Sequence, residues 1–173
     1  MKNNPLFTAV PTLPSLLETA NHVDIKTITS DVPLREFIAG MISYSPSWLK
    51  FLYGLRWFFV RLLGMKQESM PQELTMRPKN VSFEVGEPAA FFTVKMAKED
   101  KFWFAGITES HLTAHLGVVV EAGQPCRFHV VTIVHYNRWT GPVYFNVIRP
   151  FHHLVVRQMM KAGVQQPLRL QEA

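Results

Sequence analysis

The sequence predicts an α+β fold in which a curved antiparallel sheet of about six strands wraps around a long C-terminal helix. Three observations support this fold. Five strand-like segments follow one another between residues 81 and 137, and short turns separate them. One amphipathic helical segment follows directly, and one strand and two helices come before. Short turns join antiparallel neighbours, so the five segments form a meander that can close against the last helix.

The composition indicates one folded domain with a bulky apolar core. Of the 173 residues, 47% are hydrophobic and 13 are Phe. Residues 1–20 contain three prolines and no secretory signal. We expect residues 1–20 to form an extended arm with one turn of helix near 15–20, residues 21–163 to form the domain, and residues 164–173 to form a loose tail. The single cysteine favours a reducing, cytoplasmic compartment.

The charge pattern argues against nucleic acid as a partner. The formal net charge is +5, but the basic residues are scattered along the chain. A nucleic-acid binder usually concentrates them on one face or arm.

The first strand is predicted at residues 22–29, where the side chains alternate in polarity, as in a half-buried strand. The alternating sets are Val23, Ile25 and Thr27 on one face, and His22, Asp24 and Lys26 on the other. A helix then runs to about Ile42, with Asp31 as its N-cap and Pro33 in its first turn.

A second helix is predicted at Ser47–Leu63 and ends at Gly64. Three basic residues interrupt it, so no apolar run reaches the roughly 20 residues of a membrane span. Its mostly apolar surface predicts burial against the sheet or against a second subunit in a homodimer, and a helix lying on a membrane surface is the alternative. Residues 65–80 are predicted to form a long loop.

The meander and the last helix follow. The five strands are predicted at residues 81–85, 90–97, 101–108, 111–121 and 126–137. The last helix spans 140–160, with Thr140 as its cap and a kink at Pro150, which lacks a backbone N–H. Its predicted inner face consists of Tyr144, Ile148, Phe151, His152, Val155 and Met159, and its polar stripe consists of Asn146, Arg149, His153, Arg157 and Lys161.

A ligand pocket is predicted between the sheet and the last helix. If the apolar sides of the last two strands share a face, a few polar groups join an apolar lining there. The predicted ligand-binding residues are Phe92, Leu112, Leu116, Phe128, Thr132, Tyr136, Tyr144, Ile148 and His152. Trp103 or Phe104 could add to the wall, and the inward side of 101–108 is left open. The many phenylalanines could equally fill the space and leave no cavity.

The histidines are the remaining candidates for chemistry. The same register gathers His111, His115 and His135 on the opposite face, where they could bind zinc or simply be solvated. No metal-binding spacing supports zinc, so no metal site is assigned. Glu109 and His111 are the one carboxylate–histidine pair close in sequence. No nucleophile, phosphate-loop or dinucleotide motif is present, and no cofactor is expected.

Two segments resemble a known family. They are Ser45-Pro46-Ser47-Trp48 through Leu63-Gly64, and His135-Tyr136-Asn137 followed by Gly141, Tyr144 and Ile148-Arg149-Pro150-Phe151-His152. Over about residues 20–162 the chain resembles an uncharacterised bacterial domain-of-unknown-function family, whose members stand alone or follow NAD(P)-binding reductases. The element order is similar to the helix-grip superfamily of START, polyketide-cyclase and plant-allergen-like proteins. That resemblance implies a ligand tunnel between the sheet and the helix.

Three functions are consistent with these features. The first is non-enzymatic binding of a small apolar or amphipathic molecule in the cavity. The second is a cyclase, dehydratase or isomerase that uses His152 as an acid/base with Tyr144 or Thr132. The third is an interaction or membrane-surface module that uses the helix at 47–63.

Overall fold

The computed structural model describes residues 10, 12–49, 52, 54, 57, 61 and 76–170, with side chains as far as residue 165. In chain order the elements are α2 (Leu13–Glu18), β1 (His22–Ser30), α3 (Leu34–Ile42), η1 (Pro78–Asn80), β2 (Pro88–Ala89), β3 (Phe92–Lys98), β4 (Phe102–Thr108), β5 (Leu112–Glu121), β6 (Cys126–Tyr136) and α5 (Thr140–Leu170). The predicted α+β class is confirmed, because a six-stranded antiparallel sheet accompanies a long C-terminal helix.

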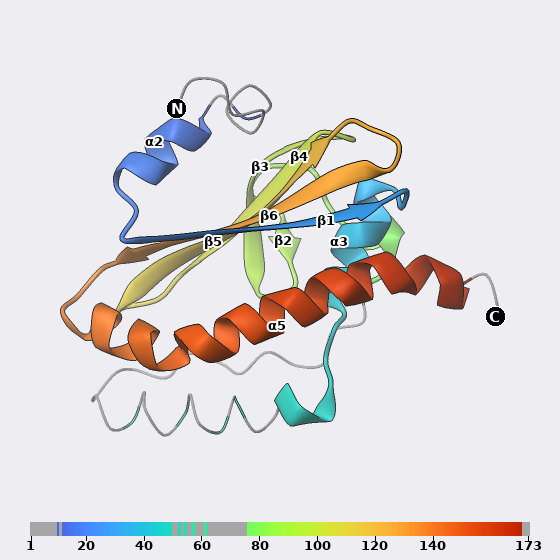
Figure 1. The fold of residues 1–173 in the computed structure, drawn as a ribbon. Coiled ribbons are helices and arrows are strands. Elements are labelled where there is room, and N and C mark those ends of the chain that lie inside the picture. Colours follow the sequence, from blue (N-terminus) through green and yellow to red (C-terminus); the bar gives the residue numbers. More distant parts are fainter. Residues whose placement is uncertain are drawn as a thin grey trace.

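The strands form one sheet in the order β1-β6-β5-β4-β3-β2, with every neighbouring pair antiparallel. Strands β2 to β6 form an antiparallel meander, in which β3 to β6 correspond to four of the five predicted strands. Strand β1 joins the far end of the meander by pairing with β6 over its whole length. Figure 1 shows α5 along one face of the curved sheet, in the helix-grip arrangement, and α2 on the other side.

Apolar cores lie on both faces of the sheet. On the inner face, α3 and α5 pack against Trp103, Val118 and Phe128. On the outer face, α2 packs against Phe104, which is fully buried. This settles the side of β4 that the sequence left open, because Trp103 belongs to the inner core and Phe104 to the outer one. The outer core depends on residues from the predicted arm, where α2 is the expected short helix.

The strand predicted at residues 81–85 is wrong. Side chains bind the backbone carbonyls there, so those carbonyls do not join a ladder. Arg35 donates to the Val81 carbonyl, and the Trp103 indole N–H donates to the Ser82 carbonyl at 3.0 Å. The sixth strand is instead the two-residue β2, which begins at Pro88 on the sheet edge, where a missing N–H is tolerated.

The N-terminal ends of α3 and α5 also differ from the prediction. The N-cap of α3 is Pro33, which makes no side-chain cap hydrogen bond, so Asp31 is not the cap. Thr140 is the first residue of α5, and its buried Oγ1 lacks a hydrogen-bond partner among the described residues. Helix α5 passes Pro150 and continues ten residues beyond its predicted end at residue 160, because Gly163 and Val164 pack against α3 and the inner core.

The predicted helix at 47–63 lies mostly outside the described residues. Residues 47–49 and the separate positions 52, 54, 57 and 61 are helical. Within the described part of the chain, no helix combines the length and the apolar character that a bilayer crossing needs.

Candidate functional site

A cavity of about 530 Å³ lies between the inner face of the sheet and α5. This volume lies within the roughly 300–1,000 Å³ of typical ligand pockets. The apolar residues that line it are Phe91, Phe92, Ile107, Leu112, Ala114, Leu116, Val134, Phe145, Ile148, Val155, Val156 and Met159. The polar ones are Glu109, His115, Thr132, Tyr144 and His152. The phenylalanines therefore line the space between sheet and helix without filling it.

Seven of the nine residues predicted to bind a ligand border this cavity. They are Phe92, Leu112, Leu116, Thr132, Tyr144, Ile148 and His152. They come from β3, β5, β6 and α5, and the antiparallel register of β5 and β6 brings Leu116 opposite Thr132. Their contact with a ligand stays a prediction.

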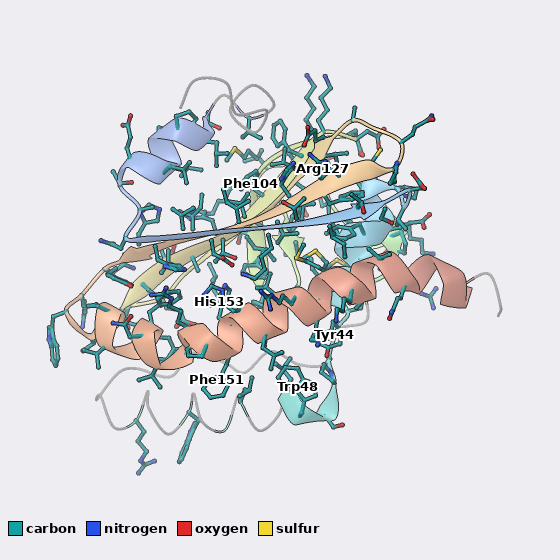
Figure 2. The ribbon with its side chains drawn as sticks, viewed as in Figure 1. Tyr44, Trp48, Phe104, Arg127, Phe151 and His153 are labelled. Atoms are coloured by element: carbon teal, nitrogen blue, oxygen red, sulfur yellow. The ribbon has the colours of Figure 1, made fainter. Side chains whose placement is uncertain are left out.

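Three residues expected to face the cavity do not line it. Phe128 stacks on Phe37 of α3 with ring centroids 4.4 Å apart, so it belongs to the closed end of the core. Tyr136 ends β6 and lies beside Gly141 and Phe145 where the chain turns into α5. Phe151 does not border the cavity, and its side chain points away from the sheet (Figure 2).

His152 is the polar group that α5 contributes to the cavity. Its Nε2 lies 3.3 Å from Thr132 Oγ1 on β6, so the two side chains form a hydrogen bond across the wall. Burial, and then the nearby Lys26, lower the pKa of His152 from 6.5 to about 4. The imidazole is therefore neutral at pH 7. It offers the cavity one uncharged hydrogen-bonding group beside a hydroxyl.

Replacing His152 with Gln should make folding less sensitive to acid. The folded-state pKa lies below the unfolded value of 6.5, so the unfolded state binds the proton first as the pH falls. Above pH 6.5 the imidazole is neutral in both states and does not change the free energy of unfolding. As the pH drops from 6.5 toward 4, protonation favours the unfolded state and the free energy of unfolding decreases. Between about pH 7 and pH 4.5, wild type should lose about 2 kcal/mol more than the variant. Urea unfolding at both pH values measures this, and equal losses would contradict the assignment.

A cluster of polar side chains lies next to the cavity, between β1 and α5. The row His22, Asp24 and Lys26 of β1 is turned toward α5, whereas Val23 and Ile25 are 38% and 43% exposed. Lys26 Nζ donates to Asp24 Oδ2 and, at 2.9 Å, to Nδ1 of His153. Figure 2 shows the His153 side chain in the space between α5 and β1.

Burial and mutual repulsion act together on this group. Burial, followed by the charge of Arg149, lowers the pKa of His22. Burial, and then Lys26, lower that of His153, and burial together with Arg157 lowers that of Lys26. Because Lys26 has only donors, Nδ1 of His153 accepts a hydrogen bond from Lys26, and the imidazole is neutral. The region carries more cationic than anionic groups.

The three histidines predicted on the outer face do not form one group. His115 and His135 lie there with ring centroids 5.7 Å apart, although His115 also borders the cavity. His111 precedes β5 and is buried against Tyr144, with its Nε2 3.3 Å from Glu109 Oε2. Across the described chain, no group of three His, Cys, Asp or Glu residues is arranged to hold a metal.

Sequence reasoning missed the group at β1. Glu109 and His111, the pair close in sequence, are indeed in contact, but Asp24 and His153 also approach to 3.3 Å across 129 positions of sequence. The signal that could have found this group is the alternation of β1 itself, combined with the matching polar stripe of α5.

A family model described as "Protein of unknown function (DUF2867)" matches residues 16–159. A solved structure titled "Crystal structure of Ara h 8.0201" is similar at 10% sequence identity, with 83% of this chain and 98% of that chain covered and a TM-score of 0.40. No curated protein matches the chain.

Proposed function

We propose that this chain, which belongs to the family described as "Protein of unknown function (DUF2867)", binds a small apolar or amphipathic molecule between its sheet and α5. The observation that carries the proposal is the cavity of about 530 Å³, whose wall is mostly apolar with a few polar groups. Such a lining buries a hydrocarbon or aromatic ligand, and sparse polar groups orient it. Family membership agrees with the resemblance of the segments at 45–64 and 135–152.

Binding has better support than catalysis. A general base works best with a pKa near the working pH, and the pKa of His152 is lowered to about 4. At pH 7 this imidazole has little tendency to remove a proton from a substrate. The hydrogen bond between His152 and Thr132 instead suits a group that recognises a ligand hydroxyl or carbonyl.

Filling the cavity should abolish binding of a neutral apolar dye. Ala114 lies on β5 and lines the cavity, so the Ala114→Phe side chain would occupy the space of the ligand. N-phenyl-1-naphthylamine should become fluorescent with wild type and be displaced by decan-1-ol. The variant should lose at least about tenfold in dye affinity, since apolar burial in the pocket is the main contribution. Fluorescence titration measures both.

The matched control is Thr113→Phe, one residue earlier, which adds a ring to the opposite face of β5. It should bind the dye like wild type, and circular dichroism should show both variants folded. Failure of wild type to bind dye or alcohol, or equal binding by folded Ala114→Phe, would refute the proposal.

Other features of the hypothesis remain predictions. The cytoplasmic compartment is inferred from the lone Cys126, which has no disulfide. A bacterial source, fusion to reductases, a homodimer and the use of the helix at 47–63 as a surface module are likewise expectations.

A further inference from the structure

Strand β1 is oriented against its own hydrophobic pattern. It is an edge strand whose apolar residues Val23 and Ile25 are 38% and 43% exposed. The charged side chains of Asp24 and Lys26 are turned inward, with only 18% and 12% of their surfaces exposed. Shielding charges from water costs free energy unless they are paired or used. Local rules of this kind are usually broken at functional sites.

The inward row of β1 continues the wall of the cavity. Asp24 pairs with Thr132 on β6, and His22 pairs with Val134, so these side chains lie side by side on the same face. Thr132 and Val134 both line the cavity. The ring of His22 lies 4.8 Å from that of Phe145, another lining residue. A ligand that fills the cavity can therefore extend one end toward β1.

Helix α5 covers this row with a stripe of basic residues. Arg149, His153 and Arg157 are spaced four residues apart, so they lie on one side of the helix. All three act electrostatically on the β1 row or on each other. We call the set of His22, Lys26, Arg149, His153 and Arg157 the basic site.

The basic site has an excess of positive charge. Lys26, Arg149 and Arg157 are cations, and within the described residues Asp24 is the carboxylate that the site contacts, through Lys26 and His153. Lys26 has three donors and uses two of them on Asp24 and His153. In addition, His22 Nε2 is buried and has no hydrogen-bond partner in the described part of the structure.

We propose that the basic site binds the carboxylate of an amphipathic acid whose hydrocarbon part occupies the cavity. This inference rests on the proposed function, because the same cavity holds the apolar part. Lys26, His22 and the guanidinium groups can donate to the carboxylate in charge-assisted hydrogen bonds. The lowered pKa values of His22, Lys26 and His153 fit a site that lacks an anion, since a bound carboxylate would favour their protonated forms.

The test compares an acid with its uncharged analogue. Decanoate and decan-1-ol share a ten-carbon chain, and each should displace N-phenyl-1-naphthylamine from the cavity. For wild type at about pH 7.5, decanoate should bind about tenfold more tightly than decan-1-ol. Lys26→Met should weaken decanoate binding by about tenfold and leave decan-1-ol unchanged, since only the acid uses the charge. Asp24→Asn should tighten decanoate binding by about threefold, because it removes a competing carboxylate.

The control is Lys101→Met, which removes an exposed lysine in the turn before β4 and should change neither affinity. Equal affinity of wild type for acid and alcohol would overturn the basic site while leaving the cavity proposal intact. So would a Lys26→Met variant that keeps wild-type decanoate affinity. If neither decanoate nor decan-1-ol displaces the dye, the proposed function itself fails. Lys26→Met and Asp24→Asn are measured independently. If one variant does not fold, the decanoate affinity of the other still tests the basic site.

Discussion

Gly117→Ala should lower the free energy of unfolding by about 3 kcal/mol. A Cβ at Gly117 on β5 would stand 2.0 Å from the ring of Phe104 on the adjacent strand. That ring is fully buried in the outer core beneath α2, so it has no open space to enter. The substitution therefore either displaces the ring or separates two central strands. Urea unfolding of wild type and variant measures the loss.

A double mutant identifies the cause of this loss. Phe104→Leu removes the ring edge that Gly117 accommodates, so the pair Phe104→Leu and Gly117→Ala should be more stable than the sum of the two single losses predicts. The coupling should amount to at least about 1 kcal/mol. Strict additivity would show that the glycine serves some purpose other than making room for the ring.

Gly163→Leu should also lower the free energy of unfolding, by about 3 kcal/mol. Helix propensity alone predicts the opposite, a gain of about 1 kcal/mol in the free energy of unfolding, because Leu is a much better helix former than Gly. In the fold, however, a Cβ at Gly163 would lie 2.7 Å from the carbonyl oxygen of Phe37 and 3.0 Å from Met41 Cγ. Backbone cannot yield as a side chain does, so α5 must move away from α3.

This displacement should also weaken ligand binding, because Val155, Val156 and Met159 of the same helix line the cavity. Thermal unfolding and dye titration measure the two effects. Lys161→Leu is the control, since Lys161 is exposed on the same helix and the substitution should leave both quantities near wild type. A Gly163→Leu variant with higher stability would mean that α3 and α5 are not in close contact at this point.

The candidate site shows how far pattern reasoning reaches. Alternation in β5 and β6 placed Leu112, Leu116 and Thr132 on one face, and helical spacing placed His152 toward that face. Phe128 followed the same alternation, yet it lies outside the cavity because α3 closes that end of the sheet. Alternation along a strand predicts which face of the sheet a residue occupies. Whether that residue lines the cavity also depends on which helix covers its part of the strand.

The sequence by itself determined strands β1 and β3 to β6, helices α3 and α5, their order and the resemblance to the family, because these depend on local period, turn chemistry and short motifs. Only the tertiary structure decided that residues 81–85 leave the sheet, that α5 reaches Leu170, and that the charged side of β1 faces inward. Each of these depends on groups far apart in sequence: Trp103 binding Ser82, Gly163 meeting Phe37, and Lys26 meeting His153. The free energy of such tertiary contacts exceeds the intrinsic secondary-structure propensity of the residues. Because the contacting residues are distant in sequence, local sequence patterns do not reveal these contacts.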